Sequence, residues 1–559
     1  MRFFAVRSTW SIAAFLAALT ALATWPLALR LTDSLPGDYG DPVFVTWAIG
    51  WVSAKLTAAL TDPAALWQLW DANIFVPEPQ TLAFSEHFLG QSVLTLPFYW
   101  VSGNLLVSYN VAFLASFFLT GLGTFLLTRA LIGNEIPALI AAVVAAFNEY
   151  RLVWELGHLH VLSLQWLPFA LYALHRYFET DARRYLVLAA AALVALNLFS
   201  IYYMAYCAPL ILLFVLFELA NKGRWRMLRV WLELWATAAL VVVATLPVML
   251  PYVEVQQRLG IQRSLAEVMQ YSATVDQYGQ ALPGLFPALV LALVGLGGVF
   301  AGGRSTTRWL ALMTFVLATV SFWFSLGPGI QFEGERLAIP ALYQLLQALP
   351  GYDGLRVPAR FASLFLLFLG ILAGLGAAAL ERRWPRTVGA AVIPATLAWV
   401  IWVAPYPLPL NQPLRSEGLA EPPAFLTPLK QPPSIYQAVD SLGPGVILVE
   451  FPFGDAGYDL RYMYFAAGHR RRLLNGYSGI FPPSFVQRQR VLARPTLDPQ
   501  AAARAIQQAT HAIVHRTAWN DNSGVVIGAW LEAFGARVIA EHYGSVLYEL
   551  PVREEMAGR

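Results

Sequence analysis

Charged residues are scarce in this chain of 559 residues. Asp, Glu, Lys and Arg make up 13% of the sequence, whereas 58% of it is hydrophobic. Ordinary soluble domains carry roughly 25% charged residues, so the apolar content exceeds what one soluble core can hold. Apolar runs close to ~20 residues recur, which is the length that crosses a ~30 Å hydrocarbon layer. The composition therefore predicts a polytopic membrane protein.

The sequence has only one cysteine and little net charge. The single cysteine, Cys207, excludes an intrachain disulfide and any CxxC-type metal site. It lies in an apolar run, where a free cysteine behaves as a small buried hydrophobe. The net charge is only +3 and no basic block interleaves with aromatic residues, so no nucleic-acid partner is predicted.

Hydropathy predicts about eleven membrane-spanning helices. Their ranges are 10–29, 109–131, 137–147, 159–177, 185–199, 202–219, 230–250, 284–300, 309–326, 361–380 and 388–403. The basic clusters at 175–184, 222–229 and 382–386 fall on the same side as the N-terminus, which the positive-inside rule makes cytoplasmic. The opposite loops are longer and more acidic, and an odd number of spans places the C-terminal region with them.

The first outer loop, 31–108, is predicted to contain helices of its own. Asp41 is expected to be the N-cap of one helix, with Pro42 at its first position. The apolar and aromatic content of 43–51 predicts that this helix lies in the membrane interface. A second segment, 88–101, is too short to span and contains Pro97.

The composition changes after residue 405. We expect residues 1–405 to form the membrane domain, 406–433 a proline-rich linker and 434–559 a small domain. Strands are predicted at 446–452, 511–515, 538–541 and 545–550, and helices at 435–442, 499–509 and 525–534. The predicted fold is an all-α polytopic membrane domain followed by a soluble α/β domain outside the cytoplasm.

Two aspartates close to the first span are the leading catalytic candidates. Asp38 lies in a turn and has no obvious structural role, whereas helix capping is sufficient to explain Asp41. A carboxylate at this position can accept a proton from an attacking hydroxyl. Asp38 is therefore the first candidate and Asp41 the second, with an exposed turn aspartate as the alternative interpretation.

Two further pairs are candidates for substrate or metal binding. Ser85 is expected to cap a short helix whose first turn holds Glu86 and His87, where the helix dipole favours an acid; the alternative is that the two bind substrate or metal. His158 and His160 lie in another outer loop. A helical zinc pair spaced by four residues is absent.

Arg356 and Arg360 stand at the outer end of a predicted span. Paired guanidinium groups bind a phosphate with bidentate hydrogen bonds. The alternative is that both side chains pair with lipid headgroups at the interface. In the C-terminal region no catalytic triad or phosphate loop is predicted, and the exposed loop 475–479 favours acceptor recognition or structural cover.

Taken together, these segments resemble the GT-C superfamily of integral-membrane glycosyltransferases, and more narrowly the RgtA/B/C/D-like and YfhO-like bacterial membrane proteins. The resemblance is carried by the segments 37–41, 75–77, 85–87, 158–168, 356–360 and 476–479. It implies a polyprenyl-phosphate-linked sugar donor and single-displacement, inverting chemistry on the outer face. It also implies that a first-loop aspartate activates the acceptor or holds a divalent metal. That role falls to Asp38 with Asp41, although many relatives have an adjacent Asp-Glu pair there.

The resemblance completes the expected site and its partners. The residues expected to bind substrate are Glu86, His87, His158, His160, Arg356 and Arg360. Mg or Mn is the metal that Asp38 and Asp41 would hold, and the acceptor is a glycan, a lipid or a protein. The expected location is the bacterial cytoplasmic membrane, with the N-terminus in the cytoplasm. The alternatives are a transporter or lipid flippase, which would carry ionisable groups near the midplane, and a non-catalytic envelope-assembly protein.

Overall fold

The computed structural model describes residues 2–302, 305–349, 351–352, 354–416, 418–423 and 425–551. Met1 and residues 552–559, which the predicted domains 1–405 and 434–559 include, lie outside the described residues. Two compact units share the chain. The helical unit comprises Met1–Ala28, Phe113–Leu250 and Gly260–Leu408, and the mixed unit comprises Leu29–Ala112, Pro251–Leu259 and Pro409–Arg559.

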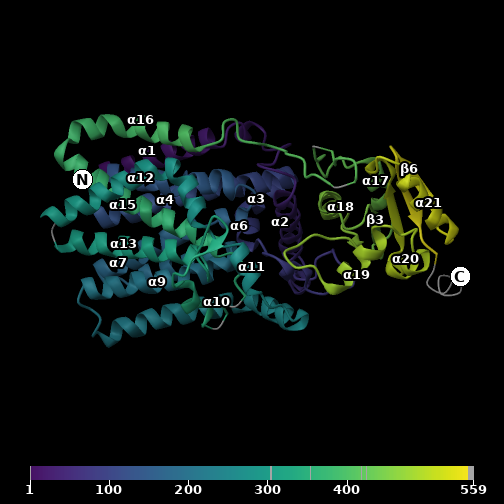
Figure 1. Cartoon of the computed structure of the whole chain (residues 1–559), viewed down its shortest axis with the longest axis horizontal. Coiled ribbons are helices and arrows are strands. Elements are labelled where there is room, and N and C mark those ends of the chain that lie inside the picture. Colours follow the sequence, from purple (N-terminus) through teal and green to yellow (C-terminus); the bar gives the residue numbers. More distant parts are fainter. Residues whose placement is uncertain are drawn as a thin grey trace. The chain divides into compact units, whose positions relative to one another are not determined.

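α-Helices make up most of the helical unit (Figure 1). They are α1 (Arg2–Ala23), α4 (Leu105–Ile132), α5 (Glu135–Ala146), α6 (Leu159–Leu162), α7 (Trp166–Thr180), α8 (Arg184–Phe199), α9 (Ile201–Asn221), α10 (Leu228–Leu259), α11 (Leu265–Gln270), α12 (Val275–Gly302), α13 (Ser305–Ser325), α14 (Tyr343–Gln347), α15 (Phe361–Arg383) and α16 (Pro385–Val403). A two-stranded antiparallel hairpin, β1 (Gln331–Phe332) and β2 (Glu335–Arg336), follows α13. The division between the units falls within α4 and α10.

Helix α15 is the centre of the helical unit. It packs against α5, α12 and α13, and a helix that is apolar on all sides is a buried helix. Two glycines four residues apart bring α5 close: a Cβ at Gly370 would lie 2.8 Å from the Ala141 carbonyl oxygen, and one at Gly374 would lie 2.8 Å from that of Pro137. Small residues with this spacing let helix backbones approach inside membranes.

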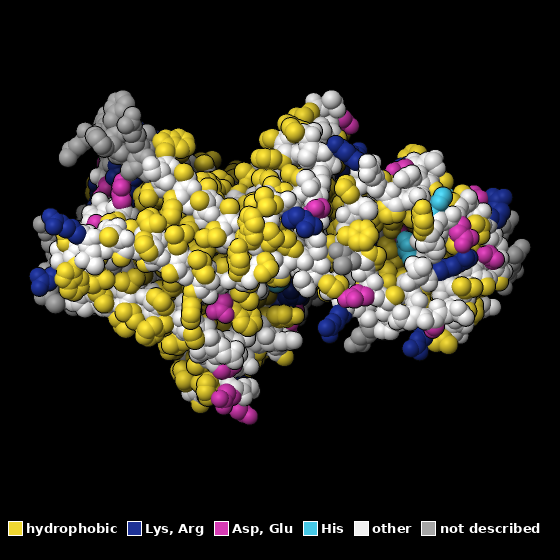
Figure 2. Space-filling view, turned by 90° about the horizontal axis from the view of Figure 1, so that it is seen from above, with side chains coloured by type: hydrophobic (Ala, Val, Ile, Leu, Met, Phe, Trp, Pro, Cys, Tyr) yellow, Lys and Arg dark blue, Asp and Glu magenta, His cyan; other side chains and the backbone are white. Residues whose placement is uncertain are grey.

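Eight helices within the described ranges are long and apolar enough to cross a membrane. They are Leu105–Ile132, Glu135–Trp154, Ile201–Asn221, Leu228–Leu259, Leu265–Val299, Thr307–Ser325, Pro358–Arg383 and Pro385–Val403. In its most apolar window α15 is 83% buried and α10 only 17% buried. Figure 2 shows hydrophobic side chains over much of the displayed face, as expected of helices that face lipid. The chain is a multi-pass membrane protein, and the predicted count of about eleven stays a prediction.

One predicted span is not a single helix. The range 159–177 is divided into α6 and α7, and Ser163, Leu164 and Gln165 separate them. Hydropathy does not detect this break because the three residues interrupt no apolar run. The shorter helices Thr9–Ala23 and Arg184–Phe199 are apolar and match two other predicted spans.

A five-stranded sheet is the core of the mixed unit, in the order β4-β3-β5-β7-β6. The strands are β3 (Ile447–Phe451), β4 (Arg472–Leu473), β5 (His511–His515), β6 (Arg537–His542) and β7 (Ser545–Glu549). β3 pairs in parallel with β4 and β5, whereas β7 is antiparallel to β5 and β6. The helices are α2 (Asp41–Ala58), α3 (Leu89–Ser102), α17 (Ser434–Asp440), α18 (Ala456–His469), α19 (Pro483–Leu492), α20 (Pro499–Ile506) and α21 (Ser523–Ala533).

The predicted α/β region is confirmed, including all four predicted strands and all three predicted helices. The additional elements among the described residues of this region are α18, α19, the short strand β4 and the 3-10 helix Arg516–Ala518. The fold class, an all-α membrane domain with a smaller C-terminal sheet region, is confirmed.

The predicted boundaries of consecutive domains differ from the two units, because the first outer loop folds with the C-terminal sheet. The amide of Phe75 donates to the carbonyl of Asn475, and that of Val76 donates to the carbonyl of Leu473, both at 3.0 Å. The predicted linker is also paired, since the Tyr39 amide donates to the Gln412 carbonyl at 2.9 Å. Hydrogen bonds between segments so far apart in sequence leave no local pattern for composition to detect.

The first outer loop does contain the predicted helices, with one correction. Gly40 is the N-cap of α2, and Asp41 is its first residue. The predicted N-cap is displaced because the Asp38 side chain closes the preceding turn by accepting the Gly40 amide at 3.0 Å. Helix α2 packs against α3 and α18, and this packing explains its apolar residues. Its predicted position in a membrane interface stays a prediction.

Candidate functional site

The aspartate loop of the mixed unit is held by backbone pairing. The Gly37 amide donates to the Pro409 carbonyl at 2.8 Å, and the Gln412 amide donates to the Gly37 carbonyl at 2.9 Å. Gly37 has φ +76°, a conformation that favours glycine. The exposed Asp38 side chain accepts the Gly40 amide, so Asp38 has the structural role that the sequence did not reveal.

Asp41 is the better connected of the two aspartates. It is half-buried, and the Tyr477 hydroxyl donates to its Oδ1 at 3.4 Å. The Tyr477 ring packs edge-on against Phe44 and Phe481, at centroid distances of 6.1 and 5.9 Å. The structure therefore joins the predicted loop 475–479 to Asp41.

That loop is not exposed as predicted. Asn475 is fully buried and Ser478 is only 4% exposed. The first outer loop covers it: a Cβ at Gly476 would lie 2.7 Å from the Phe75 ring. Only glycine leaves room for this packing, which explains the Gly476 part of the motif.

Glu86 and His87 are inside the mixed unit, at 1% and 0% exposure. Ser85 does not cap α3 but ends the preceding 3-10 turn, and the Leu89 amide donates to His87 Nδ1 at 3.0 Å. Burial lowers the pKa of His87 to about 3, so the imidazole is neutral. His87 therefore holds the start of α3 together, and its expected contact with substrate stays a prediction.

Four of the predicted residues gather in the helical unit, near Tyr202 at the start of α9 and Arg360 directly before α15. We call this group, with Glu155, the arginine end. His158 Nδ1 lies 2.9 Å from Glu155 Oε2, and the His158 and His160 rings meet edge-to-face at 5.9 Å. His160 lies within electrostatic range of Arg356 and Arg360.

Glu155 is ionised despite its position. Burial raises the pKa of this carboxyl, but the hydrogen bond from His158 and the charges of His158 and Arg360 outweigh burial and hold the pKa below its usual range. The Tyr150 hydroxyl donates to Glu155 Oε1 at 2.9 Å. Both oxygens of Glu155 thus have partners.

Arg360 is the unusual member of the arginine end. Its side chain is 8% exposed and its guanidinium lies 5.3 Å from the centroid of the Tyr202 ring. Its Nε is buried and has no hydrogen-bond partner among the residues that the structure describes. Arg356 is less buried and lies 4.8 Å from the Tyr271 ring centroid. The two arginines therefore stack on different rings while sharing His160 as a neighbour.

The loop that carries the histidines is fixed by Arg151, which is 2% exposed. Its guanidinium donates to the carbonyls of Ala146, Ser116 and Leu162, at 3.2, 3.2 and 2.9 Å. Ala146 and Leu162 end α5 and α6, and backbone carbonyls at helix ends need such donors inside a membrane protein. Arg151 is thus a positioning residue for the segment from Glu155 to His160.

One constellation in the mixed unit has no sequence signal. Glu450 is fully buried, and its Oε2 lies 2.9 Å from His515 Nε2, whose Nδ1 lies 2.8 Å from the Ser545 hydroxyl. The Tyr436 hydroxyl also donates to Glu450 Oε2, at 2.8 Å. The register of β5 and β7 pairs His515 with Ser545. This series of hydrogen bonds could therefore have been predicted only from the strand order. It fixes the orientation of the His515 ring.

No metal cluster accompanies these sites. Within the described parts of the chain, no group of three or more His, Cys, Asp or Glu residues is arranged to hold a metal ion. The Asp38–Asp41 pair offers two carboxylates, which suits Mg²⁺, an ion that proteins bind through one or two carboxylates together with substrate phosphates.

The fold of this chain is similar to the GT-C fold of solved membrane glycosyltransferases. The chain is similar to arabinofuranosyltransferase AftD from Mycobacteria, with a TM-score of 0.60 and 16% sequence identity. The match covers 98% of this chain but only 40% of AftD, so the chain spans about two fifths of that protein's length. The predicted GT-C resemblance is confirmed at the level of the fold.

Two further solved structures are similar at lower scores. ArnT from Cupriavidus metallidurans in the apo state has a TM-score of 0.49 and 14% identity, over 99% of both chains. The apo oligosaccharyltransferase from Archaeoglobus fulgidus has a TM-score of 0.49 and 12% identity, over 92% of this chain and 72% of that chain. No protein-family model and no curated protein matches the sequence.

Proposed function

We propose that this membrane protein is a glycosyltransferase that moves a sugar from a polyprenyl-phosphate donor to an acceptor outside the cytoplasm. The observation that carries the proposal is Arg360, a buried guanidinium whose Nε has no acceptor, in a chain with the GT-C fold. An unpaired buried donor costs free energy, and a phosphate oxygen is the acceptor that matches an arginine best.

The phosphate of the donor is assigned to the arginine end. The arginine end holds two arginines and one carboxylate, Glu155, which is already paired with His158 and Tyr150. The remaining positive charge stabilises the polyprenyl phosphate as it leaves the sugar. His158 and His160 lie beside the arginines and are assigned to the same donor.

The proton of the acceptor hydroxyl is assigned to a carboxylate of the aspartate loop. The contact with Tyr477 supports Asp41 as the base, and the turn-closing hydrogen bond supports a positioning role for Asp38. This order reverses the one that the sequence favours. A single displacement with such a base inverts the anomeric centre.

The direct test uses purified full-length protein and a panel of polyprenyl-phosphate sugars. Release of polyprenyl phosphate is scored for the wild type, Asp41→Asn and Asp38→Asn, with Asp33→Asn as the matched control. Asp33 lies in the same loop but is exposed and paired with Arg30 at 2.8 Å. We expect Asp41→Asn to reduce transfer by about 100-fold or more, and Asp33→Asn to leave it unchanged.

Other outcomes of this test decide between the alternatives. Full activity in both Asp41→Asn and Asp38→Asn would remove the base from this loop. Movement of a lipid-linked sugar across vesicles, with no sugar transferred or released, would favour a flippase. Addition of a chelator, followed by Mg²⁺ or Mn²⁺, tests the metal proposed for Asp38 and Asp41. Reporter fusions in bacteria test the proposed inner-membrane location and the cytoplasmic N-terminus.

A further inference from the structure

The sheet of the mixed unit has a topological switch point between β3 and β5. The chain leaves β3 through α18 to reach β4 on one side, and it leaves β5 through α21 to reach β6 on the other side. β3 and β5 are parallel neighbours, and Phe451 is paired with Val514 where they end, so the loops that follow start about 4.8 Å apart. In open α/β sheets a crevice forms outside the carboxyl ends of two such strands, and ligands bind there.

A cavity of about 850 Å³ lies at this switch point. Residues 452–455 after β3 and 521–523 after β5 line it, together with 492–497 at and beyond the end of α19. Small-molecule sites have volumes of about 300–1,000 Å³. The described residues that line the cavity include none of the arginine end and none of the aspartate loop. The crevice is therefore separate from the proposed donor site.

The two loops that form the crevice are fixed in position. Gly454 has φ +81°, a conformation that favours glycine, and Gln489 Nε2 donates to its carbonyl at 2.6 Å. Ala420 joins the loops, because its amide donates to the Ala518 carbonyl at 3.0 Å. The Ala420 carbonyl in turn accepts the Tyr458 hydroxyl, from the first turn of α18, at 2.9 Å. The crevice is thus largely formed without a ligand, as small-molecule sites usually are.

The charges of the crevice disfavour an anion. Helices α18 and α21 begin there, and amides at helix N-termini commonly bind phosphate. Here carboxylates already accept those amides. Asp455 Oδ1 accepts the Tyr458 amide at 3.1 Å, and Asp521 Oδ1 accepts the Ser523 amide at 2.8 Å. Arg494 is the one basic side chain among the described residues that line the cavity, so two carboxylates outweigh one guanidinium.

The rest of the lining is apolar, with one large ring. Trp519 is half-buried, and its ring lies against the start of α21, since a Cβ at Gly524 would be 2.9 Å from Trp519 Cε3. Leu497 and Val526 also line the crevice and are 77% and 48% exposed. A sugar ring offers C–H groups on its face and hydroxyls at its edge, which matches a flat indole with carboxylates beside it.

We propose that this crevice binds a neutral oligosaccharide. One sugar ring packs on Trp519, and a hydroxyl of that ring or of the next one donates to Asp521, two residues further along the same loop. Asp455, on the opposite loop, accepts a hydroxyl of the other side of the oligosaccharide. A carboxylate accepts several hydrogen bonds, so both acids can keep their helix amides. This binding does not depend on the proposed glycosyl transfer.

The experiment measures saccharide binding to the full chain, in a detergent that has no sugar headgroup. The probes are neutral trisaccharides of hexoses and of pentoses, a trisaccharide of uronic acids and inorganic phosphate, followed by saturation-transfer NMR and calorimetry. We expect at least one neutral trisaccharide to bind with a Kd below about 1 mM, and at least about tenfold more tightly than the uronic acids or phosphate. No binding of any neutral trisaccharide up to about 10 mM, or tighter binding of an anionic probe, overturns the proposal.

Two variants test the two kinds of contact. Trp519→Ala should weaken the bound trisaccharide by about tenfold, because the ring that covers its C–H face is lost. Trp67→Ala is the matched control, since Trp67 is in the same unit, is 86% exposed and does not line the crevice. Asp521→Asn should weaken binding by about threefold, because a charged acceptor is replaced by a neutral one.

Asp521 is exposed, and asparagine can still accept the Ser523 amide. Asp521→Asn therefore stays informative even if Trp519→Ala misfolds. An unchanged affinity in folded Trp519→Ala, or in Asp521→Asn, contradicts the assignment. An equal loss in Trp67→Ala contradicts it as well.

Discussion

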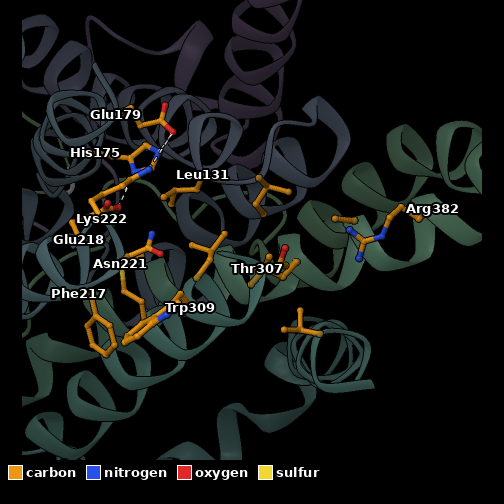
Figure 3. Close-up of a pocket in the computed structure, with 16 residues that line it drawn as sticks. Leu131, His175, Glu179, Phe217, Glu218, Asn221, Lys222, Thr307, Trp309 and Arg382 are labelled. Atoms are coloured by element: carbon orange, nitrogen blue, oxygen red, sulfur yellow. Dashed lines mark hydrogen bonds and ion pairs between the residues drawn. The ribbon is translucent and has the colours of Figure 1, made fainter. Parts of the chain in front are cut away.

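The arginine end and the carboxylate end of the helical unit each hold a glutamate against a histidine. One end lacks a hydrogen-bond acceptor, and the other lacks a hydrogen-bond donor. The carboxylate end is the group of polar side chains that line a cavity of about 250 Å³ (Figure 3), namely His175, Glu179, Glu218, Asn221, Lys222, Thr307 and Arg382.

The two ends differ in which group is left without a partner. At the arginine end Glu155 has two partners and Arg360 Nε has no acceptor among the described residues. At the carboxylate end one Glu218 oxygen lies 2.8 Å from His175 Nδ1, and its second oxygen has no donor in the part of the chain that the structure describes. The Glu–His pair is therefore common to both, and what remains unfilled beside it decides whether an anion or a cation fits.

The same helices carry both ends. α15 has 23 residues and is therefore about 34 Å long, with Arg360 directly before its first residue and Arg382 directly before its last. Over that length it is almost wholly buried, which keeps the two charged groups far apart on one rigid element. The comparison can be tested by altering each end separately.

The largest expected effect is at Arg360. Arg360→Ala should weaken binding of polyprenyl phosphate by about 100-fold, which corresponds to about 2.7 kcal/mol, because a charge-assisted hydrogen bond to the phosphate is lost. Titration of the purified protein measures this. Arg360→Lys keeps the charge but loses the planar guanidinium fork, so its affinity for polyprenyl phosphate should lie between those of the wild type and Arg360→Ala. If Arg360→Ala binds as the wild type does, the arginine end is not a phosphate site.

The contribution of Glu155 to stability can be tested at the arginine end. Glu155→Gln should lower the free energy of unfolding by about 1 kcal/mol at pH 7, since the partly buried carboxylate loses its charged hydrogen bond to His158, whose side chain is 39% exposed. The pKa of Glu155 is depressed in the folded protein, so its contribution is present above the unfolded value near 4.3 and is lost as the pH falls through the folded value. Thermal unfolding of wild type and variant should therefore converge in acid. Glu135→Gln is the control, because Glu135 is 46% exposed and its ion pair with Arg129 is long, at 3.8 Å.

His87 sharpens the comparison because it is a buried histidine with no carboxylate in hydrogen-bond contact among the described residues. Its folded pKa of about 3 is below the unfolded value, so the unfolded chain binds the extra proton. Stability should fall by up to about 1.4 kcal/mol for each unit that the pH drops below about 6.5. In His87→Asn, which keeps an acceptor for the Leu89 amide, thermal unfolding should depend less on pH. Parallel pH profiles for the two proteins would contradict this.

The smallest expected effect is at Arg356. Arg356→Ala should weaken phosphate binding by only about threefold, because this side chain is less buried than Arg360 and salt screens its charge. The same titration detects it. A loss as large as that of Arg360→Ala would mean that the two arginines bind the phosphate as one fork.

Sequence predicted what depends on local pattern. Charge-free runs predicted α9, α13 and α15, and the alternating strands 511–515 and 545–550 were confirmed. His158, His160, Arg356 and Arg360 were proposed one pair at a time, and the structure brings them together. What escaped prediction depends on distance in sequence: His175 meets Glu218 43 residues later, and Asp41 meets Tyr477 436 residues later. No periodicity or motif reports such contacts.

The pairing of Phe75 with Asn475 also sets a schedule for biogenesis. Their positions differ by 400 in the sequence, and ribosomes add about 5–20 residues per second. The first outer loop therefore waits about 20–80 s for the strand that completes it. During that interval the unpaired amides and apolar rings of this loop can contact only water, lipid or a chaperone. Synthesis of the C-terminal strands, rather than insertion of the helices, then decides when the mixed unit can close.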